Sequence, residues 1–328
     1  MNAVEGNIQK LDSSLNATAE GEFIRRESQF RHWVTADGSA GPSGSAGFKA
    51  EKDRYHLYVS YACPWAHRTL IFRALKKLED VISVSVVHPE MGKQSWHFDS
   101  RYPGATADDI NGFNMMQDIY KLANPDFNGV VTVPVLWDKH QGTIVNNESS
   151  EIIRMLNSAF NAYTNVQTDY YPETLRTSID TVNEDVYDNI NNGVYRCGFA
   201  KTQRAYEQAF DALFDSLNKL EQRLAQQRYL VGNIITEADW RLLPTLLRFD
   251  PVYVGHFKCN LYRIADFPNL SNYMRDLFQQ PGIAETFNLD HVKRHYYMSH
   301  IDINPTRIVP KGPAIDYQSP HDRDRFNL

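Results

Sequence analysis

Cysteine is scarce in this chain of 328 residues, which contains only Cys63, Cys197 and Cys259. Three cysteines so far apart cannot build a disulfide framework, and none belongs to a C-x-x-C pair of the kind that binds metal or cycles as a dithiol. The sequence therefore excludes a disulfide-stapled secreted domain and a cysteine-rich metal centre. A reducing compartment fits it best.

Long apolar runs and excess positive charge are also missing. No stretch of 18 apolar residues occurs, and the first thirty residues lack the apolar core of a signal peptide. Lys and Arg number 34 against 40 Asp and Glu, so the net charge of −6 argues against nucleic acid or an anionic membrane as a partner. We expect a cytoplasmic protein with neither partner.

Apolar residues make up 42% of the chain and aromatic residues 12%, which is enough for the cores of two domains. Residues 1–54 form an arm, because their Gly- and Ser-rich run at 38–47 is too flexible and too small to pack a core. Large rings in this arm have no obvious local partners, so we expect them to dock elsewhere: Phe30, His32, Trp33 and Phe48. The other predicted parts are an α/β domain at 55–165, an all-helical domain at 166–289 and a C-terminal extension at 290–328.

The α/β domain opens with a strand, a helix and a second strand. Residues 55–59 alternate in the manner of a half-buried strand, residues 64–78 carry apolar side chains at helical spacing, and residues 81–87 form a β-branched run. Two strands separated by a helix predict a parallel βαβ unit.

Cys63 stands at the start of the predicted helix, followed by Pro64, which suits a first helical turn. The unpaired N–H groups and the positive end of the helix dipole favour a thiolate at this position, and such sites lower the pKa of a thiol from about 8.5 to ~3.5–7.5. We therefore interpret Cys63 as a nucleophile. The alternative is a buried structural cysteine, which is our interpretation of Cys197 and Cys259.

The rest of the α/β domain is an insertion, a hairpin and a helix. The insertion spans residues 88–128 and contains a predicted helix at 108–122. Residues 131–138 and 143–145 read as paired strands, and Pro134 interrupts the first of them, which favours an edge or bend with a cis Val133–Pro134 bond. A helix at 151–160 is predicted to start with Ser149 or Ser150 as its cap.

Beyond residue 171 only helical spacing occurs. The predicted helices cover residues 175–190, 201–227, 237–249 and 270–278, and Thr236 with Asp239 forms a capping-box signal before the third. From Asp290 onward we expect an extended tail, because prolines recur there. His291 and His295 could share a helix face, but no acidic or Cys partner lies at fixed spacing, so we expect no metal.

The order of these features resembles the glutathione transferase family, whose fold is a thioredoxin-like α/β domain followed by an all-α domain. More narrowly, six separated motifs resemble the glutathionyl-hydroquinone reductases, the Xi class of that family. They lie at residues 62–67, 131–138, 147–149, 191–195, 248–253 and 295–297.

This resemblance implies a mechanism and a set of site residues. Cys63 would attack the sulfur of a glutathionyl-hydroquinone, form a mixed disulfide with glutathione and be freed by a second glutathione, since Ala66 stands where a dithiol enzyme has its resolving Cys. The resemblance places glutathione at Trp96, Val133, Glu148 and Ser149, gives catalytic roles to Tyr195 and Tyr296, and places Tyr253 in the substrate pocket. It also implies a homodimer that uses glutathione as co-substrate and holds no permanent cofactor.

Two alternatives to the reductase remain. One is a broader thiol transferase or dehydroascorbate reductase of the omega type, which would accept glutathionylated small disulfides as well as quinols. The other is a non-catalytic glutathione-binding scaffold, which the pairing of Cys63 with Pro64 disfavours.

Overall fold

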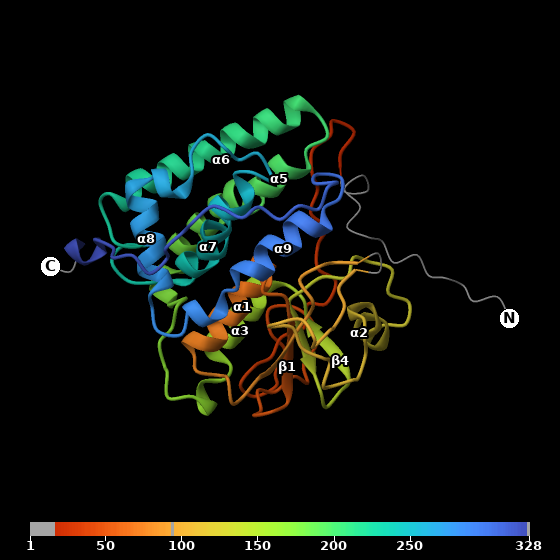
Figure 1. The fold of residues 1–328 in the computed structure, drawn as a ribbon. Coiled ribbons are helices and arrows are strands. Elements are labelled where there is room, and N and C mark those ends of the chain that lie inside the picture. The colour runs from red at the N-terminus through yellow and green to blue at the C-terminus, as the bar shows by residue number, and fades with distance from the viewer. Residues whose placement is uncertain (1–16, 93–94, 327–328) are drawn as a thin grey trace. The chain divides into compact units, whose positions relative to one another are not determined.

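The computed structural model describes residues 17–92 and 95–326, which fall into two units. One unit lies within Glu27–Gln167, and the other combines residues 17–26 with residues 168–326. Figure 1 shows the sheet and helices α1 to α3 of the first unit and the helices of the second.

A four-stranded sheet forms the centre of the first unit, in the order β2-β1-β3-β4. Its strands are β1 (Tyr55–Val59), β2 (Ser83–Val86), β3 (Val135–Asp138) and β4 (Thr143–Asn146). β1 pairs with β2 in parallel and with β3 antiparallel, and β3 pairs antiparallel with β4. The predicted parallel βαβ unit is therefore confirmed, with α1 (Pro64–Leu75) as its connection.

The other two helices of this unit are α2 (Met116–Ala123) and α3 (Ser149–Ser158). The predicted start of α2 at Asp108 is wrong, because the Asp108 carboxylate accepts the backbone N–H groups of Ile110, Asn111 and Phe113 and so holds a loop instead. The cap of α3 is Glu148, not Ser149 or Ser150 as predicted: its carboxylate accepts the Ser150 N–H.

The first predicted hairpin strand is shorter than expected and begins at Val135, since Pro134 has no N–H to give to the ladder. The Val133–Pro134 bond is cis, as predicted.

Residues 27–54 lie against this sheet. The backbone N–H of His32 donates to the Val145 oxygen at 2.9 Å, and Phe30 packs edge-on against Tyr120 at 5.8 Å between ring centroids. Docking of these rings was expected, but the assumption that they lack local partners is wrong. His32 stacks on Phe48, and the Trp33 indole N–H donates to Ser43 within the Gly- and Ser-rich run.

Helices form the second unit. They are α4 (Arg176–Asp185), α5 (Gly193–Phe199), α6 (Gln203–Leu224), α7 (Glu237–Arg248), α8 (Pro268–Phe278) and α9 (Leu289–Ser299), with π-helical turns η3 (Val186–Asn191) and η4 (Phe249–Tyr253). Short 3₁₀ turns occur at Asn161–Tyr163 in the first unit and at Glu173–Leu175, Ile264–Asp266, Ala284–Thr286 and Arg323–Phe326 in the second.

Two helices of this unit were not predicted. α5 follows the π turn η3 directly, so its apolar spacing is out of phase with that of α4. α9 occupies the start of the segment predicted to be extended. It forms because Asn288 caps the His291 N–H and Val292 and Tyr296 are buried on one face, while the helix-breaking prolines begin only at Pro305.

The capping box at the start of α7 is confirmed. The Asp239 carboxylate accepts the Thr236 N–H at 2.8 Å, and it also accepts the Leu230 N–H and the Tyr273 hydroxyl, each at 2.8 Å. This fully buried carboxylate therefore joins α7, α8 and the loop before α7.

Candidate active site

Cys63 is the N-cap residue of α1, with an extended backbone (φ −76°, ψ 122°) and Pro64 at the first helical position. The His67 N–H donates to its carbonyl oxygen at 3.0 Å, which fixes the start of the helix at this residue. The thiol is partly exposed. A partly exposed sulfur at a helix N-terminus has the access and the local positive potential that a nucleophile needs.

Val133 contacts Cys63 within the first unit. The Cys63 thiol donates to the Val133 carbonyl oxygen at 3.3 Å, immediately before the cis peptide bond to Pro134. Two residues seventy positions apart are thus brought together, as the resemblance implied. Because β3 begins only after Pro134, the backbone of Val133 is not part of the sheet. Its carbonyl oxygen lies beside the sulfur instead.

The N-terminus of α3 carries Glu148 and Ser149. The Glu148 carboxylate accepts the Ser150 N–H at 3.0 Å and the Ser28 hydroxyl at 3.3 Å. Ser149 is 3% exposed, and its buried hydroxyl has no hydrogen-bond partner among the described residues. A buried hydroxyl left unsatisfied at the positive end of a helix is suited to an anionic ligand group.

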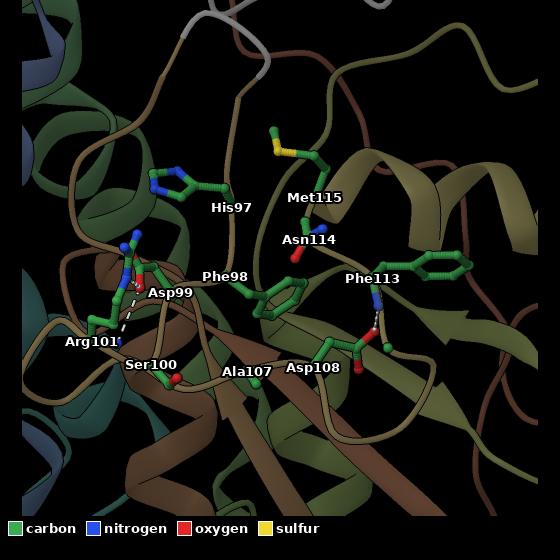
Figure 2. A pocket seen from close by; sticks show the side chains of 11 residues that line it. His97, Phe98, Asp99, Ser100, Arg101, Ala107, Asp108, Phe113, Asn114 and Met115 are labelled. Atoms are coloured by element: carbon green, nitrogen blue, oxygen red, sulfur yellow. Dashed lines mark hydrogen bonds and ion pairs between the residues drawn. The ribbon is translucent and has the colours of Figure 1, made fainter.

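Trp96 lies in the insertion after β2 and is buried, with its carbonyl oxygen accepting the Met116 N–H at 3.0 Å. Its neighbours line an open cavity of about 600 Å³ formed by residues 97–101, 107–108 and 112–115. Figure 2 shows Arg101 beside Asp99 and the Asp108 carboxylate turned toward the Phe113 backbone. The resemblance gave one residue of this insertion, Trp96, a place in the glutathione site, but sequence reasoning did not find the cavity.

Three tyrosines from three elements meet in the second unit. The Tyr296 hydroxyl of α9 lies 2.6 Å from that of Tyr195 on α5 and 3.0 Å from that of Tyr253 at the end of η4. Tyr253 and Tyr296 are fully buried, and burial raises the pKa of both well above the ordinary 10. Because one hydroxyl donates one proton, Tyr296 can donate to at most one of these two neighbours at a time. The cluster is a chain of neutral phenols.

Sequence reasoning missed two histidines that join the elements carrying these tyrosines. His256 follows Tyr253, and His300 caps the end of α9, which carries Tyr296. Their Nε2 and Nδ1 atoms lie 3.1 Å apart, and the two rings stack at 5.3 Å. Only their spacing from the tyrosine motifs, three residues after Tyr253 and four after Tyr296, could have drawn attention to them.

This histidine pair makes the stability of the fold sensitive to acid. Burial, with smaller effects of His295 and Lys258, lowers the pKa of His256 from 6.5 to about 4, and burial with His295 and His256 lowers that of His300 well below 6.5. The fold therefore holds neutral imidazoles, and the resulting stability is complete above about pH 6.5 and is lost as the pH falls toward 4.

We expect the free energy of unfolding to fall by roughly 1–2 kcal/mol between pH 7 and pH 5 because of His256 alone. Urea denaturation at both pH values measures it, and His256→Gln is the comparison, since a residue that does not titrate removes this part of the loss. An equal loss in both proteins would contradict the assignment.

Residues 17–92 and 95–326 contain no group of three or more His, Cys, Asp or Glu side chains that could hold a metal ion. His291 and His295 share α9, and both are buried. In the same part of the chain, no helix has the length and apolar character that crossing a membrane requires.

The fold and the thiol site together define a class of protein. A thioredoxin-like sheet with a cysteine at the first helix N-terminus and a cis-proline opposite, followed by a helical unit, is the architecture of a glutathione transferase. Family models agree: residues 62–159 match the glutathione S-transferase N-terminal domain and residues 203–276 the C-terminal domain.

Individual relatives narrow the class. The glutathionyl-hydroquinone reductase YqjG of Escherichia coli is 57% identical over 93% of both chains, and its glutathione-bound structure has a TM-score of 0.89 over 90% of this chain and 96% of that one. The glutathionyl-hydroquinone reductase PcpF of Sphingobium chlorophenolicum is 53% identical over 90% of both chains. The Xi glutathione transferase of Phanerochaete chrysosporium is 53% identical, with a TM-score of 0.88 over 93% of this chain and 97% of that one. This chain belongs to the glutathione transferase family, in its branch of Xi-class glutathionyl-hydroquinone reductases.

Proposed function

We propose that the protein reduces S-glutathionyl-hydroquinones to hydroquinones and uses glutathione as its co-substrate. The observation that carries the proposal is the partly exposed Cys63 thiol at the start of α1, beside the carbonyl oxygen of Val133. The relatives named glutathionyl-hydroquinone reductases, which align over nine-tenths of the chain, supply the substrate class.

Cys63 performs the group transfer in this proposal. Its thiolate attacks the sulfur of the glutathionyl group, a disulfide bond forms and the bond from that sulfur to the ring carbon breaks. The electron pair of the broken bond stays with the ring, which takes up a proton at that carbon and leaves as hydroquinone. A glutathione thiolate then attacks the mixed disulfide, so that oxidised glutathione leaves and Cys63 returns to its thiolate form.

The second step requires an external thiol. Ala66 occupies the position three residues after Cys63, where a dithiol oxidoreductase carries its resolving cysteine. The other two thiols, Cys197 and Cys259, are buried in the second unit, and burial raises the pKa of Cys259 well above its usual range. This distribution of thiols supports a monothiol cycle.

Glutathione binds, in this proposal, beside Cys63 in the first unit. The backbone of Val133, which lies beside the Cys63 sulfur, offers hydrogen bonds to its peptide groups, and the start of α3 at Glu148 and Ser149 is suited to the charged γ-glutamyl end. The family resemblance adds Trp96 to this proposed site.

Ser149→Ala tests this assignment. Because the buried Ser149 hydroxyl has no hydrogen-bond partner among the described residues, its removal should leave folding almost unchanged but weaken glutathione binding about 10- to 150-fold, the loss of one hydrogen bond to a charged group. Calorimetric titration with glutathione measures the affinity. Ser158→Ala, at the other end of the same helix, is the control; equal affinities in all three proteins would remove Ser149 from the site.

The tyrosine cluster binds the aromatic half of the substrate. Phenols whose pKa values are raised by burial stay protonated, so they can donate hydrogen bonds to the hydroquinone oxygens as negative charge develops on the ring. Tyr296 makes contact with both other hydroxyls and therefore couples them.

The protein acts in the cytoplasm as a homodimer without a permanent cofactor in this proposal, on the resemblance to Xi-class transferases and the scarcity of cysteine. Sedimentation of the purified chain tests the dimer.

The activity is tested by supplying a glutathionyl-hydroquinone with glutathione and following the release of hydroquinone and of oxidised glutathione. Equal amounts of the two products are expected. A glutathionylated small disulfide is the comparison substrate, and faster turnover of that compound would favour the omega-type thiol transferase. Binding of glutathione without turnover of either substrate would favour the scaffold.

A further inference from the structure

A histidine pair joins the two segments that carry Tyr253 and Tyr296. The Nε2 atom of His256, three residues after Tyr253, lies 3.1 Å from the Nδ1 atom of His300, the residue that caps the end of α9. The two rings also stack, with 5.3 Å between their centroids and an interplanar angle of 28°. A hydrogen bond and a ring stack therefore connect the segment after η4 with the end of α9.

Each histidine is tied to its tyrosine by a short stretch of helical backbone. The His256 N–H donates to the Val252 oxygen at 2.7 Å, so one turn of chain links His256 to the end of η4. Tyr296 and His300 are four residues apart, one turn at the end of α9, and their ring centroids lie 5.5 Å apart. A shift of one imidazole relative to the other would therefore also move the two phenols relative to each other.

Phe257 packs between the same two segments. Its ring stacks on Tyr253 at 5.5 Å and on His300 at 5.9 Å, and its centroid lies 5.6 Å from that of Tyr296. It also packs against α5, which carries the third tyrosine, since a Cβ atom at Gly198 would lie only 2.1 Å from the Phe257 ring. Only glycine allows this approach. The rings around Phe257 therefore form one packed group with the histidine pair.

The hydrogen bond between the imidazoles is a bond between neutral groups, because burial lowers the pKa of both rings. One ring nitrogen donates its proton and the other accepts it. His256 is 4% exposed, so water hardly competes for this bond, and the surrounding aromatic side chains provide the low dielectric in which a hydrogen bond is strongest.

We propose that His256 and His300 are positioning residues for the reductase reaction, whose mutual hydrogen bond holds the Tyr296 hydroxyl within reach of both Tyr195 and Tyr253. This inference rests on the proposed function, in which these phenols meet the negative charge that develops on the hydroquinone. The distances that depend on the pair are the 2.6 Å and 3.0 Å from the Tyr296 hydroxyl to its two neighbours. Both histidines act through Tyr296 and do not contact the substrate in this proposal.

Amide side chains separate the hydrogen bond from the volume of the ring. His256→Gln places an amide near the position of Nε2, His300→Asn places one near Nδ1, and an amide both donates and accepts. These two variants keep the bond, whereas His256→Leu and His300→Leu remove it. Because His300 is the less buried of the pair, His300→Leu tests the bond even if His256→Leu does not fold.

Met274→Ala is the control for lost stability. Met274 is buried in α8, a helix that packs on α6 and α7. Its truncation should lower the melting temperature at least as much as the loss of one hydrogen bond does, and it should leave kcat within about threefold of the wild type.

We expect His256→Leu and His300→Leu each to lower kcat for a glutathionyl-hydroquinone about tenfold, with the affinity for glutathione within about threefold of the wild type. His256→Gln and His300→Asn should keep kcat within about threefold. The decisive comparison is made in Tyr296→Phe protein. There, His256→Leu should lower kcat by less than about twofold, because the hydroxyl through which it acts is already missing.

Three kinetic results would overturn the proposal. Equal losses with and without the Tyr296 hydroxyl would show that the histidines act independently of it. An amide variant as slow as its Leu counterpart would show that the ring matters and the hydrogen bond does not. Unchanged turnover in both Leu variants would show that the pair has no role in the reaction.

A spectroscopic test is independent of turnover. Protein labelled with carbon-13 at the tyrosine Cζ atom gives signals that respond to the hydrogen bonding of each phenol, and the signal missing from Tyr296→Phe belongs to Tyr296. This signal should move in the Leu variants and stay at the wild-type position in the amide variants and in Met274→Ala. An unmoved signal in a folded Leu variant would contradict the positioning role. A moved signal in an enzyme that turns over no glutathionyl-hydroquinone would contradict only the proposed function.

Discussion

Cys63→Ser is expected to abolish hydroquinone release, with kcat falling on the order of 10³-fold or more. A serine hydroxyl at the start of α1 has the same location but is not ionised near neutral pH, and an oxygen cannot form the disulfide that carries the glutathionyl group. The loss therefore concerns the chemical step, and glutathione binding should remain within about threefold of the wild type.

The control for this experiment is Cys259→Ala. Cys259 is fully buried in the second unit, and its raised pKa makes it a poor nucleophile at neutral pH. Its replacement should cost stability but leave kcat nearly unchanged. If Cys63→Ser retained a substantial fraction of the turnover, or if Cys259→Ala lost activity as completely, the monothiol mechanism at Cys63 would be wrong.

Tyr296→Phe should lower kcat about 100-fold while leaving the affinity for glutathione within about threefold. The Tyr296 hydroxyl lies within hydrogen-bond distance of both Tyr195 and Tyr253, so its removal leaves two buried or half-buried phenols without their common neighbour. The donors that meet the developing charge on the ring are then no longer held in one arrangement.

Tyr297→Phe is the matched control. Tyr297 is the next residue of α9, and its hydroxyl donates to the Pro251 oxygen at 3.3 Å rather than to the tyrosine cluster. Its loss should affect stability slightly and kcat hardly at all. Unchanged turnover in Tyr296→Phe, or an equal decrease in the two variants, would remove the Tyr296 hydroxyl from the reaction.

Much of the first unit could be predicted because its local signals agree with its tertiary structure. Helical spacing after Pro64 and the interruption at Pro134 each reflect an arrangement that the sheet also requires. The strand β1 was predicted in the right place, but the expectation that it is half-buried is wrong, because all five of its residues are buried. The start of α2 could not be predicted from helical spacing. The Asp108 carboxylate accepts three backbone N–H groups and so stabilises a loop over a helix, and the spacing of apolar residues carries no sign of these hydrogen bonds.

In the second unit, the main failure was the segment that starts at α9. Prolines farther along suggested an extended tail, yet the Asn288 cap and the buried face of Tyr296 and Val292 decide the conformation of these residues. That burial depends on contacts with distant residues, such as those of Tyr296 with Tyr195 and Tyr253. Periodicity alone cannot supply them.

The candidate site also combines residues that the sequence pointed to with contacts that only the structure shows. The prediction that Cys63 is the nucleophile rests on its own sequence surroundings, and the resemblance to a known family put Val133 in the same site; the structure shows these two residues in contact. Neither route pointed to the contact between Arg25 and the Tyr195 ring, because a single arginine in a polar arm has no periodic or motif signal. Its contact with Tyr195 depends on the close approach of Gly21 to Thr202, which only the folded structure shows.

The most direct test of the central claim is the intact mass of the protein after one equivalent of a glutathionyl-hydroquinone has been added in the absence of free glutathione. The account predicts one added glutathionyl group, located on Cys63 by peptide mapping, with one hydroquinone released, and loss of that added mass when glutathione is supplied. Release of hydroquinone without a protein adduct, or an adduct on Cys197 or Cys259, would contradict it.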